Sequence, residues 1–165
     1  MTLQIGWRGE LVDVKGNLPV VGEKAPDFTL TADDLTEITL ADFAGQNLVL
    51  NIFPSIDTPT CATSTRRFNE ELASLENTTV LCVSADLPFA QKRFCGSEGL
   101  ERVKTASTFR STFADDYGVR VLTGMRRGLT ARVVVVIDTG GVVRHVELVK
   151  EVSTEPDYQA ALAVL

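Results

Sequence analysis

The 165-residue sequence predicts an α/β fold from three observations. Two continuous apolar runs, at residues 47–53 and 79–85, are typical of central strands that are covered on both faces. Each run is followed by a helical pattern, and this alternation favours parallel strands joined by helices. Residues 131–138 and 142–149 then form two further strands joined through Thr-Gly-Gly, the clearest hairpin pattern in the chain.

The segments before the first apolar run predict an added hairpin and little other regular structure. Residues 3–15 alternate apolar and polar side chains around Arg-Gly-Glu, which is typical of a β-hairpin. Residues 17–35 are rich in proline, glycine and aspartate, so we expect them to be mostly irregular. Residues 37–43 predict a short strand and turn, closed by Gly45.

A helix is expected from about residue 61 to residue 77. Phe68, Leu72 and Leu75 fall at i, i+4 and i+7, which places them on one apolar face. Oppositely charged pairs at i, i+4 suit the exposed face of the same helix. These pairs are Arg66–Glu70 and Arg67–Glu71.

The second apolar run leads into a short helix. Asp86 is expected to cap this helix, with Pro88 in its first turn and its end at Gly96. Residues 103–106 then predict a short strand, and residues 111–118 predict a helix that is stopped by their final glycine.

The chain is expected to end in a helix capped by Ser153 or Thr154, with Pro156 in its first turn. The order of elements resembles the thioredoxin arrangement, with the N-terminal hairpin and residues 85–118 as additions. We therefore predict a single thioredoxin-like domain over residues 1–165, with an N-terminal β-hairpin extension.

The composition restricts the partners and the compartment. The net charge is −6, and the basic pairs Arg66-Arg67 and Arg126-Arg127 are too small for a nucleic-acid surface. The longest strongly apolar run is too short to cross a bilayer, and the N-terminus lacks the pattern of a secretory signal. Three cysteines without a framework spacing fit a reducing compartment. We predict a cytoplasmic protein that binds neither nucleic acid nor membranes.

The three cysteines differ in their surroundings. Cys82 lies inside an apolar strand pattern, where a thiol behaves as a small apolar side chain. Cys61 follows a strand and a proline-containing loop and opens a helix, whose N-terminus favours a thiolate. Cys95 lies in the last turn of its helix, where fraying would release the thiol. A purely structural role stays open for Cys61 and Cys95 at this point.

Other cysteine chemistries fit the spacing poorly. No C-x-x-C pair is present, which disfavours structural zinc and a thioredoxin-type reductase. His145 is the only histidine, and no pattern brings it next to Cys61 as the base of a cysteine hydrolase. Thiol redox chemistry remains, in which a thiolate becomes a sulfenic acid and a second thiol condenses with it. A redox sensor and a binding module with an inert Cys61 are the alternatives.

Three stretches carry a resemblance to a known family. "PSIDTPTC" fits the peroxiredoxin pattern P-x-x-x-T/S-x-x-C, and "SADLPFAQKRFCG" and "TEPDY" are similar to the thiol peroxidase branch, the atypical two-cysteine peroxiredoxins. The resemblance covers nearly the whole chain. It implies that Cys61 is the peroxidatic cysteine and Cys95 the resolving cysteine, which form an intramolecular disulfide. It also implies that Thr58 hydrogen-bonds the thiolate and the peroxide, that Pro54 shields the pocket, and that Arg132 is the active-site arginine.

The resemblance further implies the reaction and its partners. The family reduces hydrogen peroxide and, preferably in this branch, organic (alkyl) hydroperoxides to water and alcohols. It uses thioredoxin as the electron donor, forms homodimers, and needs no metal, haem or other cofactor. A peroxide sensor that relays oxidation to a partner protein is the alternative with the same two cysteines.

This chemistry makes two physical demands. Lowering a thiol's pKa from about 8.5 to about 6 raises its thiolate fraction roughly 30-fold at pH 7. The less basic thiolate is also a poorer nucleophile, which lowers its rate of attack by about 13-fold, so the net gain in rate is only about twofold. Donors aimed at the leaving oxygen must therefore supply most of the acceleration. A disulfide needs Cα atoms within about 7 Å. A Cys61 that is closed in its pocket cannot also contact Cys95 on another helix, so we expect the first turn at Cys61 and the helix holding Cys95 to unwind during the cycle.

The apolar part of a substrate site is harder to predict from sequence. Five phenylalanines are candidates for an apolar mouth that favours alkyl hydroperoxides, although plain core packing is the commoner role of this side chain. They are Phe28, Phe53, Phe89, Phe94 and Phe113.

Overall fold

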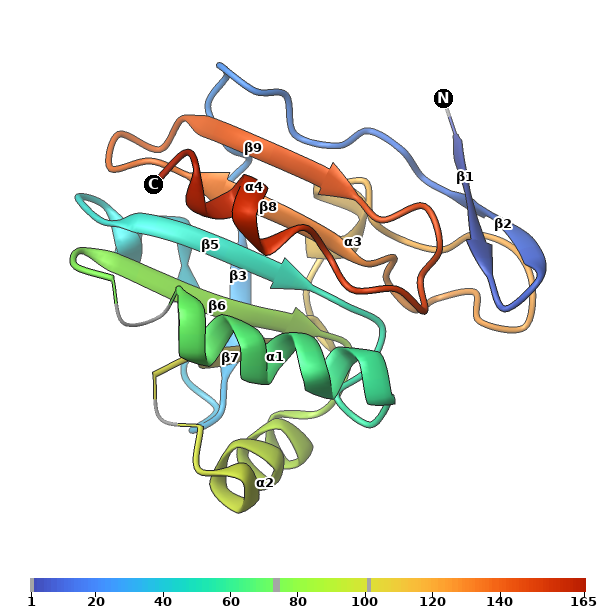
Figure 1. Cartoon of the computed structure of the whole chain (residues 1–165), viewed down its shortest axis with the longest axis horizontal. Helices are drawn as coiled ribbons and strands as arrows, with labels where there is room; N and C mark the ends of the chain where they lie inside the picture. Colours follow the sequence, from blue (N-terminus) through green and yellow to red (C-terminus); the bar gives the residue numbers. More distant parts are fainter. Residues whose placement is uncertain (1, 73–74, 101) are drawn as a thin grey trace.

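The computed structural model describes residues 2–72, 75–100 and 102–165. Its centre is a seven-stranded mixed sheet in the order β4-β3-β7-β6-β5-β8-β9, and a two-stranded sheet, β1-β2, lies at one end (Figure 1). The strands are β1 (Leu3–Trp7), β2 (Glu10–Val14), β3 (Thr29–Ala32), β4 (Glu37–Thr39), β5 (Asn47–Ile52), β6 (Thr78–Ser84), β7 (Lys104–Ser107), β8 (Val133–Ile137) and β9 (Val143–Leu148). The helices are the 3-10 helix η1 (Leu40–Phe43), α1 (Pro59–Glu71), α2 (Pro88–Glu98), α3 (Phe113–Asp116) and α4 (Tyr158–Leu162).

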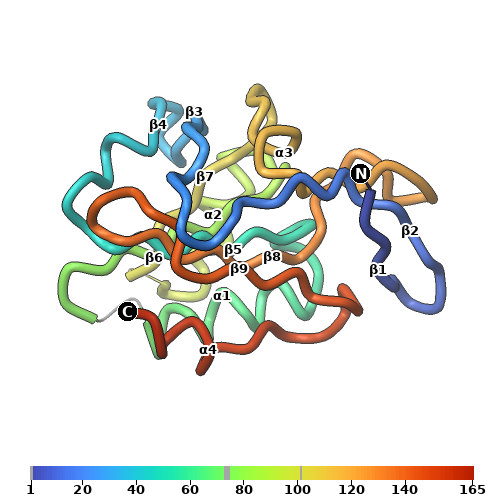
Figure 2. Tube along the Cα trace, turned by 90° about the horizontal axis from the view of Figure 1, so that it is seen from above, coloured from blue at the N-terminus to red at the C-terminus, as the bar shows by residue number. Residues whose placement is uncertain are grey.

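The arrangement confirms the predicted thioredoxin-like fold with an N-terminal hairpin. Strands β5, β6 and β7 are parallel, whereas β8 runs antiparallel to both β5 and β9. Helices α1 and α4 lie together on one face of the sheet, and α3 lies on the other (Figure 2). Within the described part of the chain, no helix has both the length and the apolar character needed to span a membrane.

Strand β5 contributes to an apolar cluster on each face of the sheet. Leu48, Leu50 and Ile52 join the cluster that includes the N-terminal hairpin. Val49 joins the cluster beneath α1 and α4, together with Phe68 of α1. Since side chains alternate along a strand, a continuous apolar run buries both faces, as predicted for this segment. This central strand therefore fixes the position at which the loop toward α1 begins.

The N-terminal hairpin is docked on the segment between β9 and α4. Its two-residue turn has positive φ angles at Arg8 and Gly9, which matches the twist of a tight hairpin. The Gly6 N–H donates to the carbonyl oxygen of Lys150 at 2.7 Å, and the Val152 N–H donates to the carbonyl oxygen of Gly6 at 2.9 Å. These two bonds bring the end of β1 next to residues that border the site described below.

One prediction about the first segments is confirmed and one about the surface pairs is wrong. Residues 17–35 are mostly irregular as predicted, except that β3 lies within them and pairs with β4 and with the distant β7. A four-residue strand carries too little pattern to reveal a partner that lies so far along the chain. Arg66 does not pair with Glu70; it reaches Glu98 of α2 at 3.0 Å, whereas Arg67 does pair with Glu71 at 2.5 Å.

The predicted helix limits also differ from the structure. Helix α1 begins at Pro59 and ends at Glu71, so Leu75 lies outside it and is exposed. Helix α2 runs beyond Gly96 to Glu98, and Gly99 in the left-handed region ends it. Its N-cap is Leu87 and not Asp86. The sequence pattern places a polar residue near a helix start, but only the tertiary partners decide where its side chain points.

The last helix starts later than predicted. Asp157 caps α4, because its side chain accepts a hydrogen bond from the Ala160 N–H at 3.0 Å. Ser153 and Thr154 are held instead by Glu151: the Ser153 hydroxyl donates to its carboxylate, and the Thr154 hydroxyl donates to its carbonyl oxygen. Pro156 precedes the helix.

Two glycines with similar backbone angles should respond differently to alanine. Gly45 (φ +84°) has open space around a Cβ, whereas a Cβ on Gly118 (φ +68°) would lie 2.5 Å from the Asn17 backbone. We expect Gly45→Ala to cost about 1 kcal/mol from backbone strain and Gly118→Ala about 3 kcal/mol or more, because the backbone must also shift. Urea unfolding of both variants measures the difference. Equal losses would show that the Gly118 contact relaxes freely.

Candidate active site

Cys61 is buried at the N-terminal end of α1. The helix begins at Pro59, with Thr58 as its N-cap, and Cys61 is its third residue. The Ala62 N–H donates to the carbonyl oxygen of Thr58, so the N–H groups of Thr60 and Cys61 precede this first intrahelical bond. The Cys61 side chain is fully buried. A helix N-terminus stabilises negative charge, and a side chain near it gains from this field.

Arg132 supplies a second positive group beside the sulfur. It lies directly before β8, is only 1% exposed, and its Nη2 donates to Cys61 Sγ at 3.3 Å. Its Nε donates to the carbonyl oxygen of Val152 at 2.9 Å. Its Nη1 is buried and has no hydrogen-bond partner among the described residues. Of the three guanidinium nitrogens, one thus donates to the sulfur, one donates to the backbone, and one has no partner among the described residues.

The loop between β5 and α1 carries the other two predicted residues. Pro54 is buried next to the end of β5. The Thr58 hydroxyl, which the resemblance assigns to the thiolate, donates here to the carbonyl oxygen of Ser55 at 3.1 Å. The structure therefore brings Pro54, Thr58 and Arg132 to one cavity, with Cys61 in contact with Arg132, and it leaves Cys95 on the separate helix α2.

A cavity of about 250 Å³ opens beside this group. Its apolar wall consists of Trp7, Pro54, Pro59, Leu129 and Val152. Its charged wall consists of Arg8, Arg126 and Arg132. The Arg126 guanidinium also stacks over the Trp7 ring, 4.8 Å from its centroid, which orders both side chains.

None of the five candidate phenylalanines lines this cavity, so that prediction is wrong. Phe28 and Phe113 pack against Tyr117 on the other face of the sheet. Phe53 is buried in the cluster beneath α1. Phe89 is 65% exposed and Phe94 lies under the Arg66 guanidinium. The sequence missed Trp7, Leu129 and Val152 as wall residues, because only hairpin docking brings Trp7 to this place.

All three cysteines are free thiols, in different environments. Cys82 is completely buried in β6, and this burial raises the pKa of its thiol to about 12. Cys95 is partly buried against the cluster beneath α1. Burial, and then the negative charge of Asp33, raise the pKa of the Cys95 thiol to about 11. In this packed position Cys95 stays protonated at neutral pH and is a weak nucleophile.

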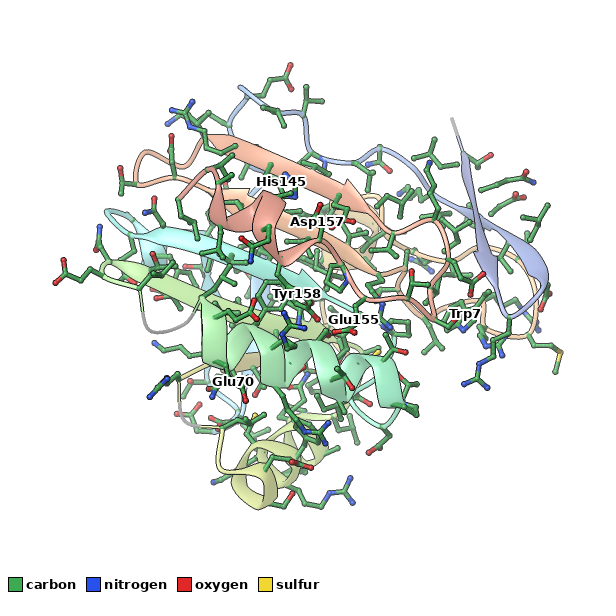
Figure 3. All side chains as sticks on the ribbon, in the orientation of Figure 1. Trp7, Glu70, His145, Glu155, Asp157 and Tyr158 are labelled. Carbon is green, nitrogen blue, oxygen red and sulfur yellow. The ribbon has the colours of Figure 1, made fainter. Side chains whose placement is uncertain are left out.

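The arrangement offers no support for metal or histidine chemistry. Among the described residues, no group of three histidine, cysteine, aspartate or glutamate side chains could hold a metal ion. His145 lies on β9 opposite Val136. Figure 3 shows His145 far from Trp7, which lines the cavity beside Cys61. The histidine is therefore not placed to act as a base for Cys61.

The family model for redoxins matches residues 20–162. The chain belongs to the redoxin family. A thiol peroxidase of Mycobacterium tuberculosis is 55% identical over 162 residues, 98% of each chain, and a thiol peroxidase of Corynebacterium glutamicum is 54% identical over 159 residues, 96% of each chain. A crystal structure of a peroxiredoxin-like protein from Aquifex aeolicus superposes with a TM-score of 0.92 at 38% identity, covering 98% of this chain and 95% of that one. This redoxin is thus a member of the thiol peroxidase branch of the peroxiredoxins, as its motifs indicated.

The alkaline stability of this redoxin should depend on Cys95. Its pKa is raised from 9.0 to about 11, so the stabilisation from the packed thiol is complete below about pH 9 and is lost as the pH rises toward 11. We expect the reduced wild type to lose more unfolding free energy than Cys95→Ser between about pH 8 and pH 10.5. Urea unfolding at the two pH values provides the comparison, and parallel losses in both proteins would contradict it.

Proposed function

We propose that this redoxin reduces hydrogen peroxide and organic hydroperoxides with Cys61 as the peroxidatic cysteine. The observation that carries the proposal is the buried Cys61 Sγ, which lies at a helix N-terminus, 3.3 Å from Nη2 of Arg132, a residue that lines an open cavity. A guanidinium and unpaired helix N–H groups both stabilise negative charge, which is the requirement for a reactive thiolate.

In the first step the Cys61 sulfur attacks one oxygen of the hydroperoxide. An S–O bond forms, the O–O bond breaks, and the departing oxygen takes a proton and leaves as water or an alcohol, so that Cys61 becomes a sulfenic acid. Negative charge grows on that departing oxygen. Arg132 Nη1 is a buried donor without a partner among the described residues, and the Cys61 N–H lies before the first intrahelical bond. Preorganised donors of this kind supply several kcal/mol of stabilisation in the transition state.

In the second step Cys95 attacks the sulfenic acid, an S–S bond forms and water leaves. Both sulfurs are held in separate packed helices, so α1 must open at its first turn and α2 must release Cys95. The raised pKa of the packed Cys95 thiol supports this requirement, because the thiol becomes more reactive only after it leaves its apolar surroundings. Thioredoxin then supplies two electrons and two protons and returns both thiols.

Three further features support the finer parts of the proposal. The apolar wall of the cavity, which includes Trp7 and Leu129, suits the carbon chain of an organic hydroperoxide. Leu87, Phe89 and Phe109 are exposed just after β6 and β7, and apolar side chains in such a position favour a homodimer. Three cysteines without a framework spacing suit a reducing, cytoplasmic compartment.

Substitution of each cysteine should separate the steps. With Trp7 fluorescence as the readout in stopped flow, wild type is expected to oxidise quickly and yield an intramolecular disulfide. Cys61→Ser should be inert, and Cys95→Ser should stop at the sulfenic acid. Cys82→Ala is the matched control, because it removes a thiol outside the proposed cycle and should keep turnover with thioredoxin. A wild-type Cys61 that reacts no faster than a free thiol would refute the peroxidase mechanism.

Removal of the Trp7 side chain should affect large substrates selectively. Because a buried aromatic wall contributes about 1.5–3 kcal/mol, Trp7→Ala is expected to lower kcat/KM for cumene hydroperoxide by about tenfold or more. The value for hydrogen peroxide should stay within about twofold. Leu11→Ala is the control, since Leu11 lies on the same hairpin but is 71% exposed. Equal losses for both peroxides would argue that the hairpin only supports the fold.

A further inference from the structure

The Asp86 carboxylate lies just after β6 and accepts three hydrogen bonds, all from residues outside α2. Its Oδ1 accepts from the Ser55 hydroxyl at 2.7 Å. Its Oδ2 accepts from the Ile56 N–H at 2.7 Å and from the Ser84 hydroxyl at 2.6 Å. Hydrogen bonds to a carboxylate are stronger than those between neutral groups, so these contacts bind the carboxylate firmly in place.

Two of these partners belong to the loop that leads to Cys61. Ser55 in turn accepts two hydrogen bonds on its carbonyl oxygen, from the Thr58 N–H at 3.2 Å and from the Thr58 hydroxyl at 3.1 Å. Thr58 is the N-cap of the helix that carries Cys61. A continuous chain of contacts therefore runs from Asp86 through Ser55 and Thr58 to the first turn of α1.

The third partner leads to the other cysteine-bearing helix. The Ser84 hydroxyl, which donates to Asp86, accepts from Gln91 Nε2 at 3.0 Å. Gln91 Nε2 also donates to the carbonyl oxygen of Ala106 at 2.9 Å. Gln91 is only 1% exposed and lies on α2 one turn before Cys95. The amide thus fastens the first part of α2 to the same carboxylate.

A second link between the loop and α2 is much weaker. Arg93 Nη2 lies 3.4 Å from Asp57 Oδ1, with both side chains about two-thirds exposed. Exposed ion pairs contribute little, because water and salt screen them. The contacts through Asp86 are more buried, and the Gln91 amide is shielded from water.

We infer that Asp86 is a positioning residue that holds the loop before Cys61 and the start of α2 in one packed arrangement, so that the two cysteine-bearing elements loosen together. The inference rests on the proposed function for the purpose of this movement, which is to bring Cys61 and Cys95 together. It concerns the reduced protein, and its test needs no peroxide.

Amide hydrogen exchange of the reduced, full-length protein tests the inference. Asp86→Ala removes all three acceptor contacts and is expected to speed exchange tenfold or more in residues 55–62 and 87–95. Asp86→Asn keeps one acceptor oxygen for the Ile56 N–H and the Ser84 hydroxyl, and its amide N–H can donate to the Ser55 hydroxyl in place of the present bond, so exchange should stay within about threefold of wild type. Gln91→Leu preserves the side-chain volume and should speed exchange in residues 55–62, although the hydrogen bonds of Gln91 go to Ser84 and Ala106.

The control is Tyr117→Phe, which removes the hydrogen bond from the Tyr117 hydroxyl to the carbonyl oxygen of Pro26 on the other face of the sheet. It should leave both segments unchanged. The inference is overturned if Asp86→Ala exchanges like this control in residues 55–62, or if Gln91→Leu changes α2 alone. If Asp86→Ala does not fold, hydrogen exchange of Gln91→Leu in residues 55–62 still tests the inference. A failure of the proposed function would appear instead as slow oxidation of Cys61 in the wild type.

Discussion

A buried guanidinium that touches a buried sulfur is the constraint on which the rest of this structure depends. Removing a positive charge from water is expensive unless other groups compensate it. Arg132 donates to the carbonyl oxygen of Val152 and to the Cys61 sulfur, while its third nitrogen has no partner among the described residues. The fold must therefore hold together three segments that are distant in sequence, those of Cys61, Arg132 and Val152.

The central strands explain how the fold meets this demand. Ile52 at the end of β5 pairs with Val133 at the start of β8, so the loop toward α1 leaves the sheet next to Arg132. The Thr130 hydroxyl donates to the carbonyl oxygen of Phe53 at 2.8 Å, and this bond joins the segment before β8 to the segment after β5. The segment after β9 brings Val152, and the N-terminal hairpin docks on that segment. The hairpin, the loop before α1, the segment before β8 and the segment after β9 thus each contribute residues to the cavity.

The packing that suits the first proposed step opposes the second. Cys61 is fully buried at a helix terminus, and Cys95 is packed on another helix with its pKa raised to about 11. A tightly closed site orders the donors around the sulfur, but it keeps the two sulfurs apart. Such a protein benefits from a few defined contacts that hold the loop and can be broken without unfolding the core. The Asp86 carboxylate, which joins the Cys61 loop to the Gln91 amide through Ser84, is suited to this role.

The sequence by itself determined the continuous apolar strands, the hairpins and the position of Cys61 at the start of a helix, because these features depend on local periodicity and on proline and glycine. Its motifs also pointed to the thiol peroxidase branch of the peroxiredoxins, with Cys61 and Arg132 among the expected site residues. Only the tertiary structure decided that β3 pairs with β7 and that Trp7 rather than a phenylalanine lines the cavity. It also decided that the Asp86 side chain accepts from Ser55 instead of capping α2. The reason is the same in each case. These side chains and strands have several acceptable local partners, and the contact that is made depends on residues far along the chain that only folding brings within reach.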